Sequence, residues 1–177
     1  MLRPSMPGSS APASRPAPRP APVLLALFAL VVGGTLLLAA PSKAHAQAMK
    51  GKVVVSDAEF GTGFGSDADM MKAVKKQSKT TIKGENGTWT LNLMVFLNAA
   101  PGADTINIVY YDVSVKPRDQ VNFSEVKVQP TQKIVQVNGV SISKDLGFVK
   151  GHKYDVLATR IIGGKEKVYA KGTVTLK

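Results

Sequence analysis

The sequence predicts an all-β domain that follows an N-terminal export leader. Apolar and polar residues alternate with a period of two over several segments, which is the pattern of strands with one buried face. Turn residues separate these segments at short intervals, and no helical crossover lies between the later ones, so antiparallel pairing is favoured. We therefore expect about seven to eight strands and one short helix, arranged as a sandwich or a barrel.

Residues 1–46 have the features of an export signal. Three arginines precede an apolar run of 18 residues over 23–40, no acidic residue occurs before Asp57, and a small-x-small cleavage pattern ends at Ala46. This combination resembles the general secretory signal peptides of bacteria. The resemblance implies cleavage near Ala46, a single mature domain over 47–177 and a secreted or periplasmic location. An N-terminal membrane anchor is the alternative, because an uncleaved run of this length can span a bilayer.

The composition excludes several kinds of site. The chain has no cysteine, which rules out disulfides, thiolate metal sites and cysteine nucleophiles. It has 23 Lys and Arg residues against 12 Asp and Glu residues, a formal net charge of +11. The leader contains four of the basic residues, which leaves the mature domain a charge of +7 and only two arginines, Arg118 and Arg160. So few arginines disfavour specific readout of phosphates or bases, and no specific nucleic-acid partner is expected.

A strand at Lys52–Ser56 opens the domain, and a helix is expected near 67–78. Ser66 is the expected N-cap, because it begins an S-x-x-D sequence in which Asp69 can bond back. Acidic residues at the start of the segment and lysines at its end complement the helix dipole. The next strand is expected at Thr80–Gly84.

The clearest strand pattern lies at Thr88–Asn98. Every second residue from Trp89 to Leu97 is apolar, so Trp89 is expected in the core. The intervening residues are polar except Met94 and Phe96, and the second face should therefore become covered toward the strand's end. The remaining strands are expected at Thr105–Val115, Val121–Val128, Lys133–Ser143, Lys153–Ile162 and Lys167–Leu176.

Two glycine-containing turns bear on the strand register. Asn138-Gly139 is a two-residue hairpin signal that would pair Val137 with Val140, and a bent continuous strand is the alternative. At Gly163-Gly164, a two-residue turn would send the apolar rows of the last two strands to opposite faces. We therefore expect a three- or five-residue loop there, with a glycine at positive φ.

Tyr154 begins a predicted strand two residues before Val156 and follows a glycine-containing loop. This arrangement resembles the penultimate strand of immunoglobulin-like domains, in which a tyrosine bonds back to upstream backbone. Val156 stands where antibody domains have a cysteine, and Trp89–Leu97 would be an inner strand. The resemblance covers about 80–177 and implies an immunoglobulin-like antiparallel β-sandwich. It implies the fold alone, because this superfold hosts many functions.

Catalysis is not expected. His152 is the only histidine after the leader, and no G-x-S-x-G elbow accompanies it. A triad would need Ser141 or Ser143 as nucleophile and Asp145 or Asp155 as the orienting acid. A solvent-facing loop histidine is the simpler interpretation. An extracytoplasmic hydrolase that uses His152 or a carboxylate pair is the second hypothesis for function.

No metal or cofactor site is expected either. Asp67 and Asp69 could attract Ca²⁺, but the pattern of an EF-hand loop is absent, and the acidic start of a helix explains both residues. The glycines over 61–65 lie between a strand and a helix without the spacing of a dinucleotide-binding loop. They are expected to form a flexible connection.

Lysines form the candidate binding surface. They can attract anionic glycans or lipid headgroups electrostatically. A solvated face, or protection of edge strands from aggregation, is the structural alternative. The lysines lie near the helix and in the last hairpin: Lys72, Lys75, Lys76 and Lys79, and Lys165, Lys167 and Lys171.

The leading hypothesis is an exported, non-catalytic binding or structural module of the cell envelope or extracellular space. Its expected partner is a protein or an anionic glycan or lipid surface, and membrane contact is expected only through an uncleaved leader. A third hypothesis is a subunit of a surface assembly that pairs by β-strand addition.

Overall fold

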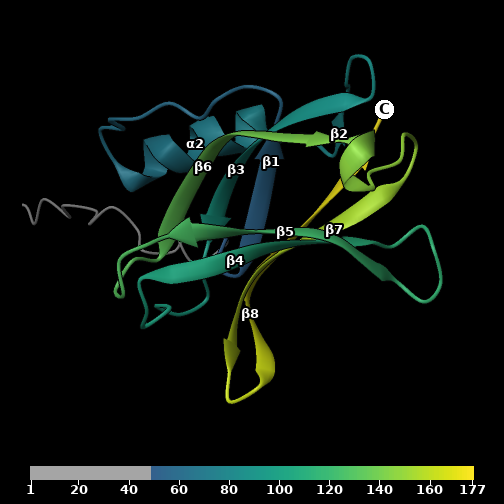
Figure 1. Ribbon diagram of the computed structural model, residues 1–177. Helices are drawn as coiled ribbons and strands as arrows, with labels where there is room; N and C mark the ends of the chain where they lie inside the picture. Colours follow the sequence, from purple (N-terminus) through teal and green to yellow (C-terminus); the bar gives the residue numbers. More distant parts are fainter. Residues whose placement is uncertain (1–48) are drawn as a thin grey trace, which may run out of the picture. The chain divides into compact units, whose positions relative to one another are not determined.

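The computed structural model describes residues 49–177 (Figure 1). The leader, its apolar run and its cleavage site lie outside the described residues, so the export signal stays a prediction. The described part is mostly β, with one short helix, as the alternation predicts. Its elements are β1 (Lys52–Ser56), α2 (Asp67–Gln77), β2 (Thr81–Ile82), β3 (Thr88–Phe96), β4 (Thr105–Asp112), β5 (Asp119–Lys127), β6 (Ile134–Ser143), the 3₁₀ turn η1 (Lys144–Leu146), β7 (Lys153–Ile162) and β8 (Lys165–Leu176).

All eight strands belong to one sheet, which is nearly closed and barrel-like. The strand order is β5-β4-β7-β8-β1-β3-β6, with the short β2 paired to β8. Pairing is antiparallel except where β8 meets β1 and β2, which it pairs in parallel. The separate sheets of an immunoglobulin-like sandwich are not confirmed, because β8 hydrogen-bonds to β7 on one side and to β1 on the other and so joins the two halves. Figure 1 shows this strand curving from one group of strands to the other.

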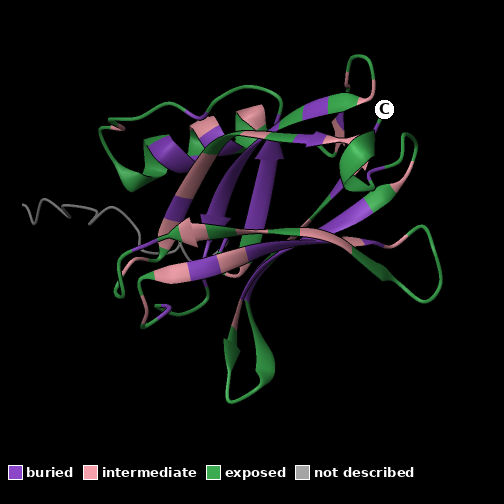
Figure 2. Cartoon of the chain, viewed as in Figure 1, coloured by how far each residue is buried: buried purple, intermediate pink, exposed green. Residues whose placement is uncertain are grey.

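The main core lies inside the curved sheet (Figure 2). The residues of β3 that were expected to face inward, from Trp89 through Leu91 and Leu93 to Val95, are all buried there. Apolar residues of β4, β7 and β8 face them from the other half of the sheet. The period-two alternation of β3 therefore marks its core face correctly.

A second, smaller core lies between α2 and the outer face of β1 and β3. Met71 and Val74 of the helix are buried against strand residues that include Met94 and Phe96. The cover expected on the second face of β3 is thus supplied by the helix.

Helix α2 begins after Ser66, whose Oγ accepts a hydrogen bond from the Asp69 backbone N–H at 3.2 Å. The same Oγ donates to the Asp69 carboxylate at 2.7 Å. Lysines occupy the last turn, where they complement the helix dipole. Among the described residues, no helix is long and apolar enough to cross a bilayer.

Both glycine turns differ from the favoured expectation. The Asn138-Gly139 hairpin is not formed: β6 continues through it with a bulge, and the amide oxygen of Asn92 accepts a hydrogen bond from the Gly139 N–H at 2.9 Å. The alternative of a bent continuous strand is the one observed. Gly139 has a φ of +66°, which the bulge requires and glycine adopts without strain.

The longer loop predicted at the last hairpin is also wrong. Gly163 and Gly164 form a tight two-residue turn, with φ values of +58° and +75°, so the expectation of a glycine at positive φ is confirmed. The register is corrected by a bulge instead, because Thr159 pairs with Val168 whereas Ala158 pairs with Ala170. The skipped residue, Tyr169, enters the core, and Val168 is exposed.

Candidate functional site

A groove of about 520 Å³ opens where β1 and β8 meet beside the C-terminal end of α2. These two strands pair at a single position, Lys52 with Lys171. Beyond it the segment after the helix enters between them, since the Lys79 N–H donates to the Val55 carbonyl at 2.8 Å and the Thr80 carbonyl accepts from Thr175 at 2.9 Å. The lining residues are Met49, Lys52, Val53, Val54, Val55, Lys75, Ser78, Lys79, Thr80, Lys171, Gly172 and Thr173.

The lining of this groove is basic. It includes four lysines from three parts of the chain and no acidic residue: Lys52, Lys75, Lys79 and Lys171. One of them is already engaged, because the ammonium of Lys171 lies 2.7 Å from the buried carboxylate of Asp155. Hydroxyl groups of Ser78, Thr80 and Thr173 add neutral hydrogen-bonding groups between the charges. The groove can therefore attract an anionic group and offer it hydrogen bonds.

Gly172, one of the lining residues, allows β8 to lie close against β1. A Cβ at this position would collide with the carbonyl oxygen of Val53, so only glycine allows β8 to approach β1 this closely. The apolar lining residues are Met49 and the three valines of β1. The lining of the groove thus combines lysines with apolar residues.

The lysines of the predicted binding surface do not all lie at one site in the structure. Lys75, Lys79 and Lys171 meet at the groove, together with Lys52, which the sequence argument missed. Lys72 and Lys76 are exposed on α2 but do not line the groove. Lys165 and Lys167 lie at the other end of the long β7–β8 hairpin. Lys52 could not be assigned from the sequence because the parallel meeting of β1 and β8 has no local sequence signal.

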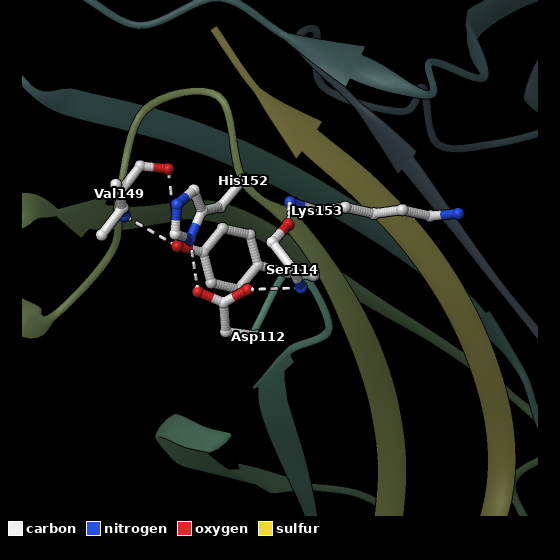
Figure 3. A network of polar contacts seen from close by, with 6 residues as sticks. Asp112, Ser114, Val149, His152 and Lys153 are labelled. Carbon is white, nitrogen blue, oxygen red and sulfur yellow. Dashed lines mark hydrogen bonds and ion pairs between the residues drawn. The ribbon is translucent and has the colours of Figure 1, made fainter. Parts of the chain in front are cut away.

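The acidic partner of His152 is neither Asp145 nor Asp155 but Asp112. Its Nδ1 lies 2.6 Å from Oδ2 of Asp112, which is buried, while the histidine side chain is 32% exposed (Figure 3). The other carboxylate oxygen accepts a hydrogen bond from the Ser114 N–H at 2.8 Å. Asp155, which was one of the suggested acids, pairs with Lys171 instead. Antiparallel pairing of β4 with β7 places Asp112 opposite Tyr154 and so beside His152.

Tyr154 bonds back to upstream backbone as the immunoglobulin-like pattern suggests. Its hydroxyl accepts a hydrogen bond from the Val149 N–H at 2.7 Å. Burial raises the pKa of the Tyr154 hydroxyl above its ordinary value, and the nearby charge of Asp112 acts in the same direction. The backbone contact with Val149 acts in the opposite direction.

These contacts hold the loop before β7 against β4. The His152 N–H donates to the Val149 carbonyl at 3.2 Å, and the Lys153 N–H donates to the Ser114 hydroxyl at 2.8 Å. Figure 3 shows these groups converging between the two strands. Within residues 49–177, no serine or threonine hydroxyl is hydrogen-bonded to the His152 ring. The contact of Asp112 with His152 has the geometry of an orienting acid and a base. Among the described residues, no hydroxyl nucleophile is hydrogen-bonded to this histidine to form a catalytic triad.

Comparison with known proteins does not provide an assignment. No protein-family model, curated protein sequence or solved structure matches the chain. In the part of the chain that the structure describes, no group of three or more acidic or histidine side chains is placed to hold a metal ion.

Proposed function

We propose that the protein is an exported, non-catalytic module that binds an anionic ligand in the lysine-lined groove between β1, β8 and the end of α2. One observation carries the proposal: four lysines from three parts of the chain line one groove of about 520 Å³, no acidic residue lines it with them, and Lys171 alone of the four has an ion-pair partner among the described residues. The other three lysine charges repel one another, and an anionic ligand would relieve that repulsion.

Protection of sheet edges does not explain these lysines. The edge strands of the sheet are β5 and β6, whereas β1 and β8 are neighbours at its centre. Lysines that prevent edge-to-edge aggregation belong on edge strands. Protection of edges from aggregation therefore does not account for the groove lysines.

The ligand that fits best is an anionic glycan. Lysine ammonium groups act as strongly hydrated point charges and suit dispersed sulfate or carboxylate groups, whereas base and phosphate readout favours arginine. Both arginines of the described residues are used within the protein: Arg118 stacks 4.4 Å from the centroid of the Tyr111 ring, and Arg160 donates to the Pro101 carbonyl. This supports the expectation that nucleic acid is not read specifically.

The test compares two double variants of the full chain by titration calorimetry with a heparin-derived hexasaccharide. Lys75→Glu with Lys79→Glu changes the groove, and Lys72→Glu with Lys76→Glu makes the same charge change outside it. We expect the first pair to weaken binding at least about tenfold more than the second, with an affinity that falls as salt is raised. Equal losses for the two pairs, or no binding by the unaltered chain, would contradict the proposal.

The architectural and cellular parts of the proposal have separate support. The main core lies between opposing halves of the sheet, and the Tyr154 contact with Val149 matches the tyrosine corner, which supports a relationship to immunoglobulin-like sandwiches. The leader pattern over residues 1–46 supports export to the periplasm or the medium.

A hydrolase is the second candidate function, and the contact between Asp112 and His152 favours it. Neither residue lines the groove, so a substrate bound there would not meet this pair. If the purified chain had a hydrolytic activity that His152→Ala abolished, and the unaltered chain did not bind the hexasaccharide, this candidate would replace the binding module.

Strand addition is less well supported. Both edge strands, β5 and β6, are long enough to pair with a further strand. Each carries a bulge, opposite Tyr110 in β5 and opposite Asn92 in β6. Bulges interrupt the regular row of backbone groups that an added strand would need.

A further inference from the structure

The end of the β7–β8 hairpin forms an arm, residues 160–168, that leaves the sheet. Pairing of β4 with β7 ends at Thr159, and β1 touches β8 at Lys171, so the arm has a partner strand on neither side. The bulge at Tyr169 lies at the base of the arm. Figure 1 shows the arm projecting away from the other strands.

The arm exposes several apolar side chains to solvent. Ile161 is 60% exposed, Ile162 is 45% exposed and Val168 is 41% exposed. These are three of the seven large hydrophobic residues that are exposed among the described residues. The arm is coloured as exposed in Figure 2 around its whole tip. Apolar side chains gathered on a projection are typical of a surface that contacts another apolar phase.

Positive charge surrounds this apolar tip. Lys165 follows the glycine turn, and Lys167 lies two residues further on. The single acidic residue of the arm, Glu166, is directed toward the body of the protein, where its carboxylate accepts a hydrogen bond from the Tyr111 hydroxyl at 3.4 Å. Lys165 pairs with Ile162 across the turn, whereas the Lys167 ammonium lies 5.0 Å from the centroid of the Tyr169 ring, behind the tip at the base of the arm. The tip therefore presents Lys165 and the two isoleucines, with the Lys167 charge behind them.

We propose that the arm inserts its tip into the surface of an anionic lipid bilayer. Ile161 and Ile162 would enter the boundary between headgroups and acyl chains, and Lys165 and Lys167 would remain among anionic headgroups while their aliphatic stems follow the isoleucines inward. Gly163 and Gly164 have no side chains to desolvate at the leading point of the turn. The lysine charges complement an anionic surface, which a zwitterionic membrane would not supply.

The shape of the arm favours a bilayer over a protein partner. A stable protein interface buries on the order of 800 Å² on each side. A two-residue turn with three exposed apolar side chains supplies much less contact area. A bilayer needs only a small apolar tip with cations behind it.

The experiment places a reporter on the arm itself, so that membrane binding through the leader does not confuse the result. The full chain carrying Ile162→Trp is mixed with vesicles in which about a third of the lipid is phosphatidylglycerol and the acyl chains are brominated. Leu146→Trp, at an exposed apolar residue of η1, is the matched control. We expect quenching and a blue shift for the first protein and neither for the second. Pure phosphatidylcholine vesicles should quench neither.

The charge requirement is tested in the same background. Lys165→Gln with Lys167→Gln should raise the lipid concentration needed for half-maximal quenching of the Ile162→Trp protein roughly thirtyfold, because each lysine near an anionic surface contributes about a factor of five. Lys72→Gln with Lys76→Gln, which removes the same charge from α2 outside the groove, should leave it unchanged, so failure of the groove proposal does not affect this result. Absence of quenching at Ile162→Trp, or equal quenching at Leu146→Trp, would overturn the proposal.

Discussion

Replacing Tyr110 with phenylalanine should stabilise the protein, whereas the same replacement at Tyr154 should destabilise it. Both tyrosines are buried and both rings pack against Phe148, with centroid distances of 5.5 Å for Tyr110 and 5.1 Å for Tyr154. The hydroxyl groups differ. The Tyr154 hydroxyl accepts a hydrogen bond from the Val149 N–H, while the Tyr110 hydroxyl is buried without a hydrogen-bond partner in the described part of the chain.

The expected magnitudes follow from that difference. A buried polar group without a partner costs about 1–3 kcal/mol, and Tyr110→Phe removes such a group at the expense of a small void. We expect a net gain of about 1 kcal/mol in the free energy of unfolding. Tyr154→Phe creates the same kind of defect, because it leaves the Val149 N–H unpaired, and should cost about 1–3 kcal/mol.

Urea unfolding of both variants and the unaltered protein at neutral pH measures the two effects. The midpoints should move in opposite directions while the dependence of the unfolding free energy on urea stays the same. If Tyr110→Phe destabilises the protein as much as Tyr154→Phe, the hydroxyl of Tyr110 is satisfied in solution and the reasoning is refuted.

The same tyrosines predict how stability depends on pH. Burial raises the pKa of both hydroxyls above the ordinary value of 10.0. Because the folded state keeps protons that the unfolded state releases, the free energy of unfolding should be insensitive to these groups below about pH 10 and should fall as the pH rises further. Tyr110→Phe should make that decline shallower, and urea unfolding at several alkaline pH values checks it.

Five further substitutions test other contacts by urea unfolding. Asp112→Ala removes the partner of His152 and should cost about 2 kcal/mol, and a double-mutant cycle with His152→Ala should show that the two losses are not additive. Gly172→Ala forces a side chain against β1 and should cost more than about 3 kcal/mol, whereas Gly139→Ala meets open space and should cost only the roughly 1–2 kcal/mol of a left-handed backbone. Ser66→Ala should cost about 1 kcal/mol through loss of the helix cap, and an equal unfolding midpoint for this variant would show that α2 does not depend on its cap.

Local features of the fold could be predicted from the sequence because their causes are local. The bounds of β1 and β7 match the expected ranges, and α2 starts where Ser66 and Asp69 form a cap. Alternation identifies the core face of β3 because one buried face is enough to produce it.

Features that depend on pairing between distant strands could not be predicted. A bulge at Tyr169 brings the apolar residues of β7 and β8 to the same face of the sheet. A longer loop at the turn would produce the same alternation in the sequence, so the sequence cannot distinguish the two. The acid beside His152 comes from a strand 40 residues away in the chain. Lys52 joins the groove because β1 lies beside β8, an order that neither composition nor periodicity reveals.

The central position of β8 has a consequence for how this sheet can form. Without β8, the order of the strands separates into two three-stranded pieces, β5-β4-β7 and β1-β3-β6. β8 follows β7 through a two-residue turn, so the β7–β8 hairpin is the most local strand pairing of the sheet. The pairings β4–β7, β3–β6 and β1–β3 join strands that are distant along the chain, and so does the contact of β8 with β1 that links the two pieces. Because distant pairings must close long loops, the slow step of folding should be the assembly of these pairings rather than the formation of the β7–β8 hairpin. Substitutions where β8 meets β1 should therefore slow folding more than substitutions in the β7–β8 turn.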